Sequence, residues 1–419
     1  MLSREDNELL VRTGPGTPMG ALMRRFWAPV MLESELGGPD SAPVRVNVLG
    51  EQLVAFRDTS GTIGLIDAYC PHRRANMFWG RNEEHGLRCV YHGWKFDVNG
   101  QCTDLPNCPE GTNLHERVTT SAYPTIASGG LVFAYMGPPE FKPALPNIEV
   151  FQAPPDRRII YKLVVKGNYF QMLEGDIDSS HVSFLHSRLD GAPLAGSLSR
   201  TDMFQDTMPR WTIDETDYGL ALTSQRNAGP DRYQYRVTQH LFPFVNLIAA
   251  PHGERMLANV RVPIDDESSL FFRVYVHPDR ALTDADRASI DNGIISPEMV
   301  PGRFEAVECM ENDYLIDREA QRTQTFTGIK SIPAQDLAVA QDQGGLIADR
   351  SREYLVSSDR AIIAARKKFL TRVKALVRGE EPPEASSPAA YGVRAIDFYL
   401  PRDVAVADGA KDLLVAGAR

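Results

Sequence analysis

The sequence has no uninterrupted apolar run that approaches the roughly 18 residues of a membrane span. Its first residues lack the basic stretch and the continuous apolar stretch of a secretory signal. Basic side chains are in the minority, because 45 Lys and Arg stand against 55 Asp and Glu, for a formal net charge of −10. A nucleic-acid-binding protein normally needs a basic surface. We therefore expect a soluble cytoplasmic protein that binds neither membranes nor nucleic acid.

Cysteine is also scarce, with five in 419 residues, an odd number that does not suggest a disulfide framework. Three of the five, Cys102, Cys108 and Cys309, show no metal-ligand spacing and are expected to be reduced thiols. The other two lie close to histidines, in Cys70-Pro-His72 and in Cys89-Val-Tyr-His92. The cysteine chemistry of the chain is therefore expected in this one stretch.

The two short motifs supply two thiolates and two imidazoles, and sixteen residues separate them. Such a set suits either a structural zinc ion or a [2Fe–2S] cluster in which histidines replace cysteines on one iron. Zinc-finger motifs usually keep like ligands together, whereas each motif here mixes the two kinds. The pattern therefore favours a [2Fe–2S] cluster held by Cys70, His72, Cys89 and His92, with zinc as the alternative.

Short alternating strands separated by Gly and Asp turns surround this stretch. They are expected at residues 44–48, 53–56, 63–66 and 131–135. Six prolines between residues 137 and 157 indicate a connector after the last strand. We expect a helical segment at residues 1–40, an all-β domain at 41–140, a connector at 141–157 and a second domain at 158–419.

The second domain alternates strand and helix patterns. Strands are predicted at residues 159–165, 211–213, 220–223, 233–241, 256–262 and 270–276. Helices are predicted at 168–185, around Gln335, and at 359–377, where Gly379 and two prolines mark the end. These elements predict an α+β domain in which long helices pack on an antiparallel sheet.

A second metal-ligand pattern lies in the first of these helices. Two histidines and one carboxylate form the facial triad of non-haem Fe(II) oxygenases, which leaves open positions on the iron. His181 and His186 are five residues apart, so a π-bulge or a break must bring both to one side. Asp178 lies one helical turn before His181 and can accept the other ring N–H of that histidine.

These motifs together resemble the Rieske non-haem iron aromatic-ring-hydroxylating oxygenases, in the phthalate-dioxygenase branch. The resemblance rests on Cys70-Pro-His72, on Cys89-Val-Tyr-His92-Gly-Trp-Lys-Phe and on Glu174-x₃-Asp178-x₂-His181-x₄-His186, preceded by Asn168. The opening residues 2–10 and the turn at 14–18 also look like this branch. Tyr169 departs from it, because tryptophan usually follows the asparagine in this family.

The resemblance implies a Rieske domain followed by a helix-grip catalytic domain, assembled as a homotrimer. His181, His186 and Asp336 would hold a mononuclear Fe(II), with Asp313 as the competitor for the third position. Asp178 and Asn168 would belong to the catalytic site. In the trimer, Asp178 of one chain would bridge its own His181 and the partner subunit's His92.

The same resemblance implies the function of a terminal oxygenase that oxidises an aromatic compound with O₂. Ring hydroxylation, dihydroxylation and O- or N-demethylation stay open, and electrons would come from a separate flavin and iron–sulfur reductase. The alternative is a Rieske electron-transfer protein without oxygenase chemistry. Arg210 or Arg236 could bind a substrate carboxylate, and residues 233–246 are expected to help form the pocket.

Overall fold

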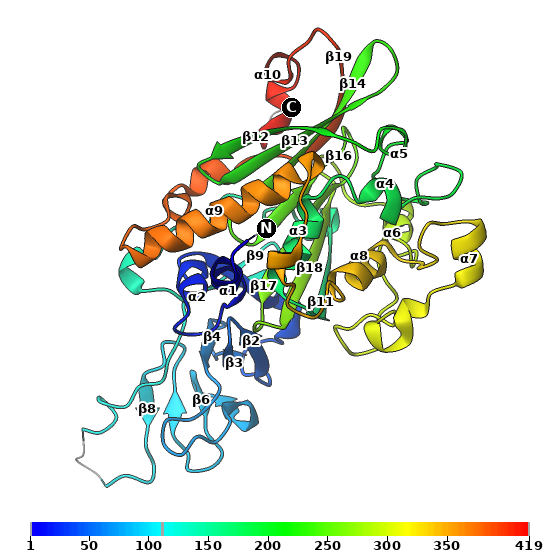
Figure 1. Ribbon diagram of the computed structural model, residues 1–419. Helices are drawn as coiled ribbons and strands as arrows, with labels where there is room; N and C mark the ends of the chain where they lie inside the picture. Colours follow the sequence, from blue (N-terminus) through cyan, green and yellow to red (C-terminus); the bar gives the residue numbers. More distant parts are fainter. Residues whose placement is uncertain (1, 110–112, 418–419) are drawn as a thin grey trace. The chain divides into compact units, whose positions relative to one another are not determined.

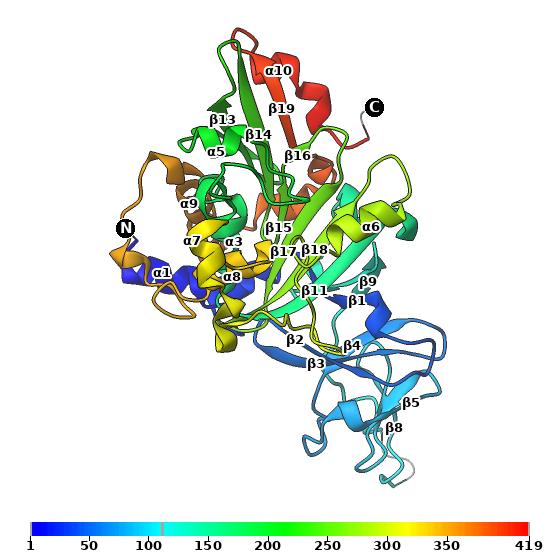
Figure 2. The same cartoon turned by 90° about the vertical axis from the view of Figure 1, so that its right-hand side faces the viewer.

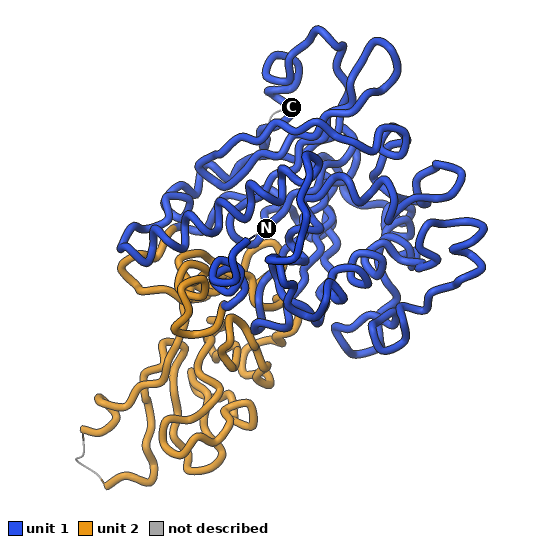
Figure 3. The backbone as a smooth tube through the Cα atoms, viewed as in Figure 1, with its two compact units in different colours: residues 1–12, 144–419 blue, residues 13–143 orange. Residues whose placement is uncertain are grey.

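The computed structural model describes residues 2–109 and 113–417. The chain divides into two compact units, one formed by residues 13–143 and the other by residues 1–12 and 144–419 (Figure 3). Within the described residues, no helix combines the length and the apolar character that crossing a membrane requires.

Two helices form near the start of the chain, as the sequence predicts. Helix α1 (Arg4–Val11) begins at Ser3, whose Oγ accepts a hydrogen bond from the Asp6 N–H at 3.0 Å. Helix α2 (Pro18–Met23) begins at Thr17 in the same way. Such caps satisfy backbone N–H groups that the first helical turn leaves unpaired.

The smaller unit is built from three small antiparallel sheets. The first contains β1 (Trp27–Leu32), β10 (Leu131–Tyr135) and β9 (Thr125–Ser128), and the second contains β2 (Val44–Val48), β3 (Glu51–Arg57) and β4 (Ile63–Asp67). The third contains β5 (Arg81–Glu83), β6 (Gly86–Arg88), β7 (Lys95–Phe96) and β8 (Cys102–Asp104). Because β1 belongs to this unit, the predicted helical segment 1–40 includes a strand. The other predicted domain limits stay predictions.

The larger unit is organised around one nine-stranded sheet. Along its main path lie β11 (Arg158–Lys166), β18 (Ser268–Val276), β17 (Met256–Pro263), β15 (Val245–Ile248), β14 (Arg232–Leu241), β13 (Gly219–Asn227) and β12 (Arg210–Thr216). Strand β19 (Ile396–Pro401) pairs with β14 and with β16 (Ala250–Pro251). Every pairing except that of β16 with β19 is antiparallel.

Three helices cover one face of this sheet (Figures 1 and 2). They are α3 (Tyr169–Ile177), α8 (Ile332–Ala340) and α9 (Arg360–Val377). Helix α3 packs on β15 and β17, and α9 packs on β12 and β13. Helix α9 ends before Gly379, whose φ of +89° suits glycine. The predicted α+β helix-grip arrangement is therefore confirmed.

The larger unit departs from the sequence prediction in two respects. The predicted helix at 168–185 is broken, because α3 ends at Ile177 and a second short helix, α4 (Val182–Leu185), follows. Strands β15, β16 and β19 were not predicted from the sequence. The break matters for function, since both histidines of the second motif flank α4.

Candidate metal centres

Two loops of the smaller unit carry the Cys-His motifs, and both loops are closed in the same way. Each cysteine N–H donates to the carbonyl five residues later, and each cysteine carbonyl accepts from the N–H four residues later, at 2.8 to 2.9 Å. That fourth residue is Arg74 in one loop and Gly93 in the other, with φ of 57° and 80°. The shared geometry presents the motif side chains from two similar tight turns.

The motif side chains combine two buried thiols with two histidine rings that each leave one nitrogen without a protein partner among the described residues. Cys70 and Cys89 are buried free thiols, and burial together with the neighbouring Cys89 raises the pKa of Cys70 to about 11. The rings of His72 and His92 have centroids 4.5 Å apart. Among the described residues, the buried Nδ1 atoms of both histidines have no hydrogen-bond partner. A buried thiol that resists ionisation, a second buried thiol beside it and two imidazole nitrogens without partners fit a cationic iron–sulfur group, which would stabilise the thiolates.

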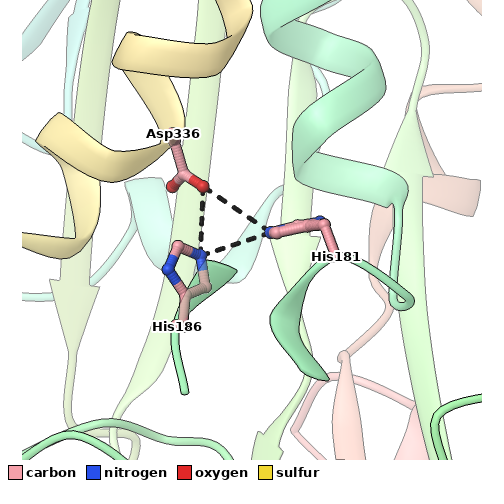
Figure 4. A group of neighbouring side chains, drawn as sticks. All are labelled: His181, His186 and Asp336. Carbon is pink, nitrogen blue, oxygen red and sulfur yellow. Dashed lines mark hydrogen bonds and ion pairs between the residues drawn. The ribbon is translucent and has the colours of Figure 1, made fainter. Parts of the chain in front are cut away.

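A second group of donor atoms lies in the larger unit, where His181, His186 and Asp336 converge (Figure 4). The Nε2 atoms of the two histidines are 3.3 Å apart. Oδ1 of Asp336 lies 3.6 Å from Nε2 of His181 and 3.0 Å from Nε2 of His186. Two imidazole nitrogens and one carboxylate at this spacing match the facial triad of a non-haem iron site.

The break between α3 and α4 brings the two histidines together. Asp178 follows the last residue of α3 and has an extended conformation, and His181 directly precedes α4. His186 follows the last residue of α4. A continuous helix would separate residues five apart by about 500° of rotation, so they would not share a face. The short helix instead turns both rings toward one point (Figure 4).

The third member of the cluster, the carboxylate of Asp336, comes from α8, about 150 residues later in the chain. Helix α8 begins at Ser331, whose Oγ accepts a hydrogen bond from the Ala334 N–H at 3.3 Å. Burial alone would raise the pKa of Asp336, but His186 and His181 lower it to about 2, so the carboxylate is ionised. Asp313, the competing residue, is exposed and lies outside the cluster.

The other ring nitrogen of each histidine faces a polar side chain, which lies within hydrogen-bonding distance for His186 but not for His181. Nδ1 of His181 lies 3.6 Å from Oδ2 of Asp178. Nδ1 of His186 lies 2.7 Å from Oε1 of Gln335, and Nε2 of Gln335 donates to the Ile329 carbonyl at 2.7 Å. The second bond fixes the orientation of the amide, so His186 donates from Nδ1 and keeps Nε2 free. The sequence predicted a helix around Gln335 but indicated no role for its side chain.

Asn168 does not join this cluster. Its Oδ1 caps α3 by accepting from the Phe170 N–H at 3.1 Å, and its Nδ2 donates to the carbonyls of Val11 and Asp266 at 3.0 and 2.8 Å. The side chain is fully buried. These contacts hold the start of α3, a structural role that differs from the predicted catalytic one.

The triad borders a cavity of about 780 Å³ of empty volume that is open to solvent. Strand residues of the same face form much of its wall: Arg236 and Thr238 on β14, Leu257 and Asn259 on β17, and Arg273 and Tyr275 on β18. Because side chains alternate along a strand, these pairs all point to the concave side. Strand β14 therefore contributes to the pocket as expected, whereas Arg210 and residues 242–246 are not among the cavity walls.

Replacing Gln335 by leucine is expected to weaken ferrous-ion binding at the triad by about 10- to 100-fold. Leucine has a similar size but cannot accept the Nδ1–H of His186, so the ring loses the contact that fixes its orientation. Anaerobic titration with ferrous ion would measure the affinity. The exposed Gln324 offers a control, because Gln324→Leu should leave the affinity unchanged. Equal affinity in Gln335→Leu and the unaltered protein would contradict the assignment.

Family models match both units. Residues 26–124 match the Rieske [2Fe-2S] domain, and residues 134–397 match the LigXa C-terminal domain like family. The 3-chlorobenzoate-3,4-dioxygenase oxygenase subunit of Comamonas testosteroni is 37% identical over 96% of this chain and 95% of its own length. The phthalate 4,5-dioxygenase oxygenase subunit of Pseudomonas putida is 39% identical over 91% of this chain and 88% of its own length.

A solved structure, NdmB of Pseudomonas putida CBB5, superimposes with a TM-score of 0.62 at 17% identity, covering 90% of this chain and 97% of that one. This likeness supports the fold alone. The sequence matches show the family, and both relatives are named as oxygenase subunits of dioxygenases. The chain belongs to the Rieske non-haem iron oxygenases, in the phthalate-dioxygenase-like branch, as an oxygenase subunit with a [2Fe–2S] cluster and a mononuclear iron as cofactors.

Proposed function

We propose that this chain is the terminal oxygenase that oxidises an aromatic carboxylate. The observation that carries this substrate class is Arg273, which lines the cavity and is 8% exposed. Among the described residues, its guanidinium makes no hydrogen bond or ion pair, and its buried Nε has no partner. A buried cation without a counter-ion is costly. The carboxylate of a substrate would supply the missing anion.

The other arginines considered are already engaged. Arg236 also lines the cavity, but its Nη1 lies 3.5 Å from Oδ2 of the buried Asp397. Arg210 is exposed, and its Nε donates to Oε1 of Gln225 at 3.2 Å. The compounds after which the two relatives are named, phthalate and 3-chlorobenzoate, are aromatic carboxylates, which supports the same class.

In this proposal, Cys70, His72, Cys89 and His92 hold the cluster, and His181, His186 and Asp336 hold the ferrous ion. When bound, the cluster supplies electrons and the iron activates O₂. The protein binds the substrate carboxylate at Arg273 and positions the ring beside the triad. Leu257, Ile295 and Tyr275 give this cavity an apolar lining that excludes water from the ring. Asp178 and Gln335 keep both histidine rings oriented toward the centre.

Replacing Arg273 by glutamine is expected to raise KM for an aromatic carboxylate such as benzoate or phthalate by about 10- to 100-fold. This range corresponds to the loss of one charged hydrogen-bonding contact. The methyl ester of the same acid should bind both proteins about equally, because it carries no charge to lose. The matched control is Arg210→Gln, which should keep the original KM. An unchanged KM for the acid in Arg273→Gln would rule out this anion site.

A substrate panel tests the function itself. The purified chain, with a surrogate flavin and iron–sulfur reductase, should consume O₂ and add oxygen to an aromatic carboxylate, as read by product mass. Detection of oxygenated or demethylated product also identifies the reaction type. The rival function, a Rieske electron-transfer protein without oxygenase chemistry, predicts reduction of the cluster but no substrate-dependent O₂ uptake.

We further propose a cytoplasmic homotrimer in which Asp178 lies between His181 and the partner subunit's His92. Two features of Asp178 support this role. Its side chain is 19% exposed, so a second group can reach it. Although burial would raise the pKa of Asp178, contact with His181 lowers it, so the carboxylate is ionised and can accept two hydrogen bonds. Size-exclusion chromatography with light scattering would measure the assembly.

A further inference from the structure

The chain between α4 and α5 (Asp202–Gln205) runs as a loop (Figure 1), and part of this loop lines the cavity. Residues 190–200, here called the roof segment, form no helix or strand apart from an isolated bridge between Ser187 and Pro193. Four consecutive roof residues, Gly196, Ser197, Leu198 and Ser199, line the cavity. Without strand pairing, side chains must hold this segment in place.

Two side-chain contacts anchor the roof segment close to Gly196. Leu194 packs in an apolar cluster with Leu257 and Tyr275 of the sheet. Nη2 of Arg255 donates to the Gly196 carbonyl at 2.8 Å. Glycine allows the close approach, because its φ is +79° and a Cβ atom there would lie only 3.2 Å from Cγ1 of Ile295.

Arg255 contacts the roof segment through its guanidinium and also lines the cavity. Its Nη1 donates to Oγ of Ser289 at 3.4 Å, in helix α6 (Asp284–Ile290), so the group spans from α6 to the roof segment. Its central carbon lies 5.8 Å from the centre of the Tyr275 ring, and Arg255 is itself a cavity-lining residue. No acidic side chain within the described residues pairs with it, and its buried Nε has no partner.

A charged N–H donor forms a stronger hydrogen bond to a carbonyl than a neutral donor does. The bond to Gly196 therefore resists outward movement of the roof segment. Because Ser197 to Ser199 follow directly, the position of Gly196 sets the space between these residues and the facing strand residues Leu257 and Tyr275.

We propose that Arg255 is a positioning residue that ties the roof segment over the cavity and so limits the size of the ring system that the cavity accepts. The substrate class in this proposal rests on the proposed function. The hydrogen bond from Arg255 to the Gly196 carbonyl, here called the tether, does not depend on it. Removal of the guanidinium frees the Gly196 carbonyl, widens the cavity and exposes a small substrate to water. Small acids then bind less well, and the kcat/KM for larger acids rises relative to that for small acids.

Hydrogen–deuterium exchange of the purified full chain tests the tether without turnover. In Arg255→Ala, the amides of residues 194–199 should exchange about tenfold faster than in the unaltered protein, since local opening costs less free energy. The Ser197 N–H is a suitable reporter, because it donates to the Leu194 carbonyl at 3.0 Å. The control is Arg303→Ala, whose exposed side chain pairs with Glu305 at 3.5 Å. Unchanged exchange in Arg255→Ala overturns the proposal.

Substrate size provides the second measurement, with benzoate and 2-naphthoate as the two acids. Arg255→Ala should raise KM for benzoate while kcat stays within about twofold, and should shift the kcat/KM ratio about tenfold toward 2-naphthoate. An equal loss for both acids would make Arg255 a simple anion contact and overturn the proposal. If the unaltered enzyme oxidises neither acid, the proposed substrate class fails, and the exchange rates still decide the tether.

Discussion

Replacing His186 by alanine is expected to reduce oxygenase turnover by about 1,000-fold or more, while the visible absorption of the Rieske cluster stays intact. The ring of His186 is 6% exposed, and its Nε2 lies 3.0 Å from Oδ1 of Asp336. Without it, the triad keeps one imidazole and one carboxylate, too few to hold ferrous ion firmly. Loss of metal catalysis worth about 4 kcal/mol corresponds to this factor.

Three measurements on the same protein make this prediction specific. Turnover is followed by O₂ uptake and product mass, the cluster by its visible absorption, and total iron by chemical analysis. Iron should fall to the two ions of the cluster, from three. The exposed His252 provides the control, and His252→Ala should keep all three signals. Either unimpaired oxidation or loss of the cluster's colour in His186→Ala would refute the assignment of His186 to a separate iron.

Replacing Glu174 by glutamine is expected to lower the free energy of unfolding by about 3–5 kcal/mol, because two buried arginines lose their shared carboxylate. Nη2 of Arg350 lies 2.8 Å from Oε2 of Glu174, and Nε of Arg366 lies 2.6 Å from Oε1. Arg350 is fully buried and Arg366 is 4% exposed, so water cannot replace the lost charge. The urea midpoint of unfolding, followed by fluorescence, would measure the change.

Glu353 is the matched control for this substitution. It also pairs with Arg366, but its side chain is 28% exposed. Glu353→Gln should therefore cost about 1 kcal/mol or less, as exposed ion pairs do. Equal urea midpoints for Glu174→Gln and Glu353→Gln would contradict a dominant buried charge network. The network matters for function because helix α3 carries both Glu174 and, at its end, Asp178.

The same carboxylate gives stability a defined pH dependence. Burial would raise the pKa of Glu174, but the charges of Arg350 and Arg366 outweigh it and lower the pKa below its usual value. A carboxylate with a lowered folded pKa contributes its full stability above the unfolded pKa of about 4.3, and loses it as the pH falls through the folded pKa. Acid unfolding should therefore show a smaller pH dependence below about pH 4.3 in Glu174→Gln than in the unaltered protein.

The Rieske motif could be predicted from the sequence because its four ligands lie within two short loops. Local chain geometry alone brings Cys70 near His72 and Cys89 near His92, and the mixed order of ligand types distinguishes the motif from zinc fingers. The strands of the larger unit were predicted for a similar reason, since alternating side chains are a local property. Strand β19 was missed because its pairing with β14 joins residues more than 150 positions apart.

The mononuclear centre could be predicted only in part. The spacing of His181 and His186 demanded an irregular helix, and the structure has a break between α3 and α4. The choice between Asp336 and Asp313 needed the fold, because nothing local distinguishes two acidic residues so far along the chain. Arg273 interrupts the apolar run of residues 270–276, a signal that could have drawn attention to it.

The sequence by itself determined the two kinds of metal ligand, the α+β class of the larger unit and the family, because ligand spacing and side-chain periodicity are short-range properties. Only the tertiary structure decided which carboxylate joins the histidines, that Asn168 is a helix cap, and that Arg273 and Arg255 border the cavity. Each of these depends on chain packing that brings distant segments together, and one sequence does not specify which of many exposed or buried polar residues will meet.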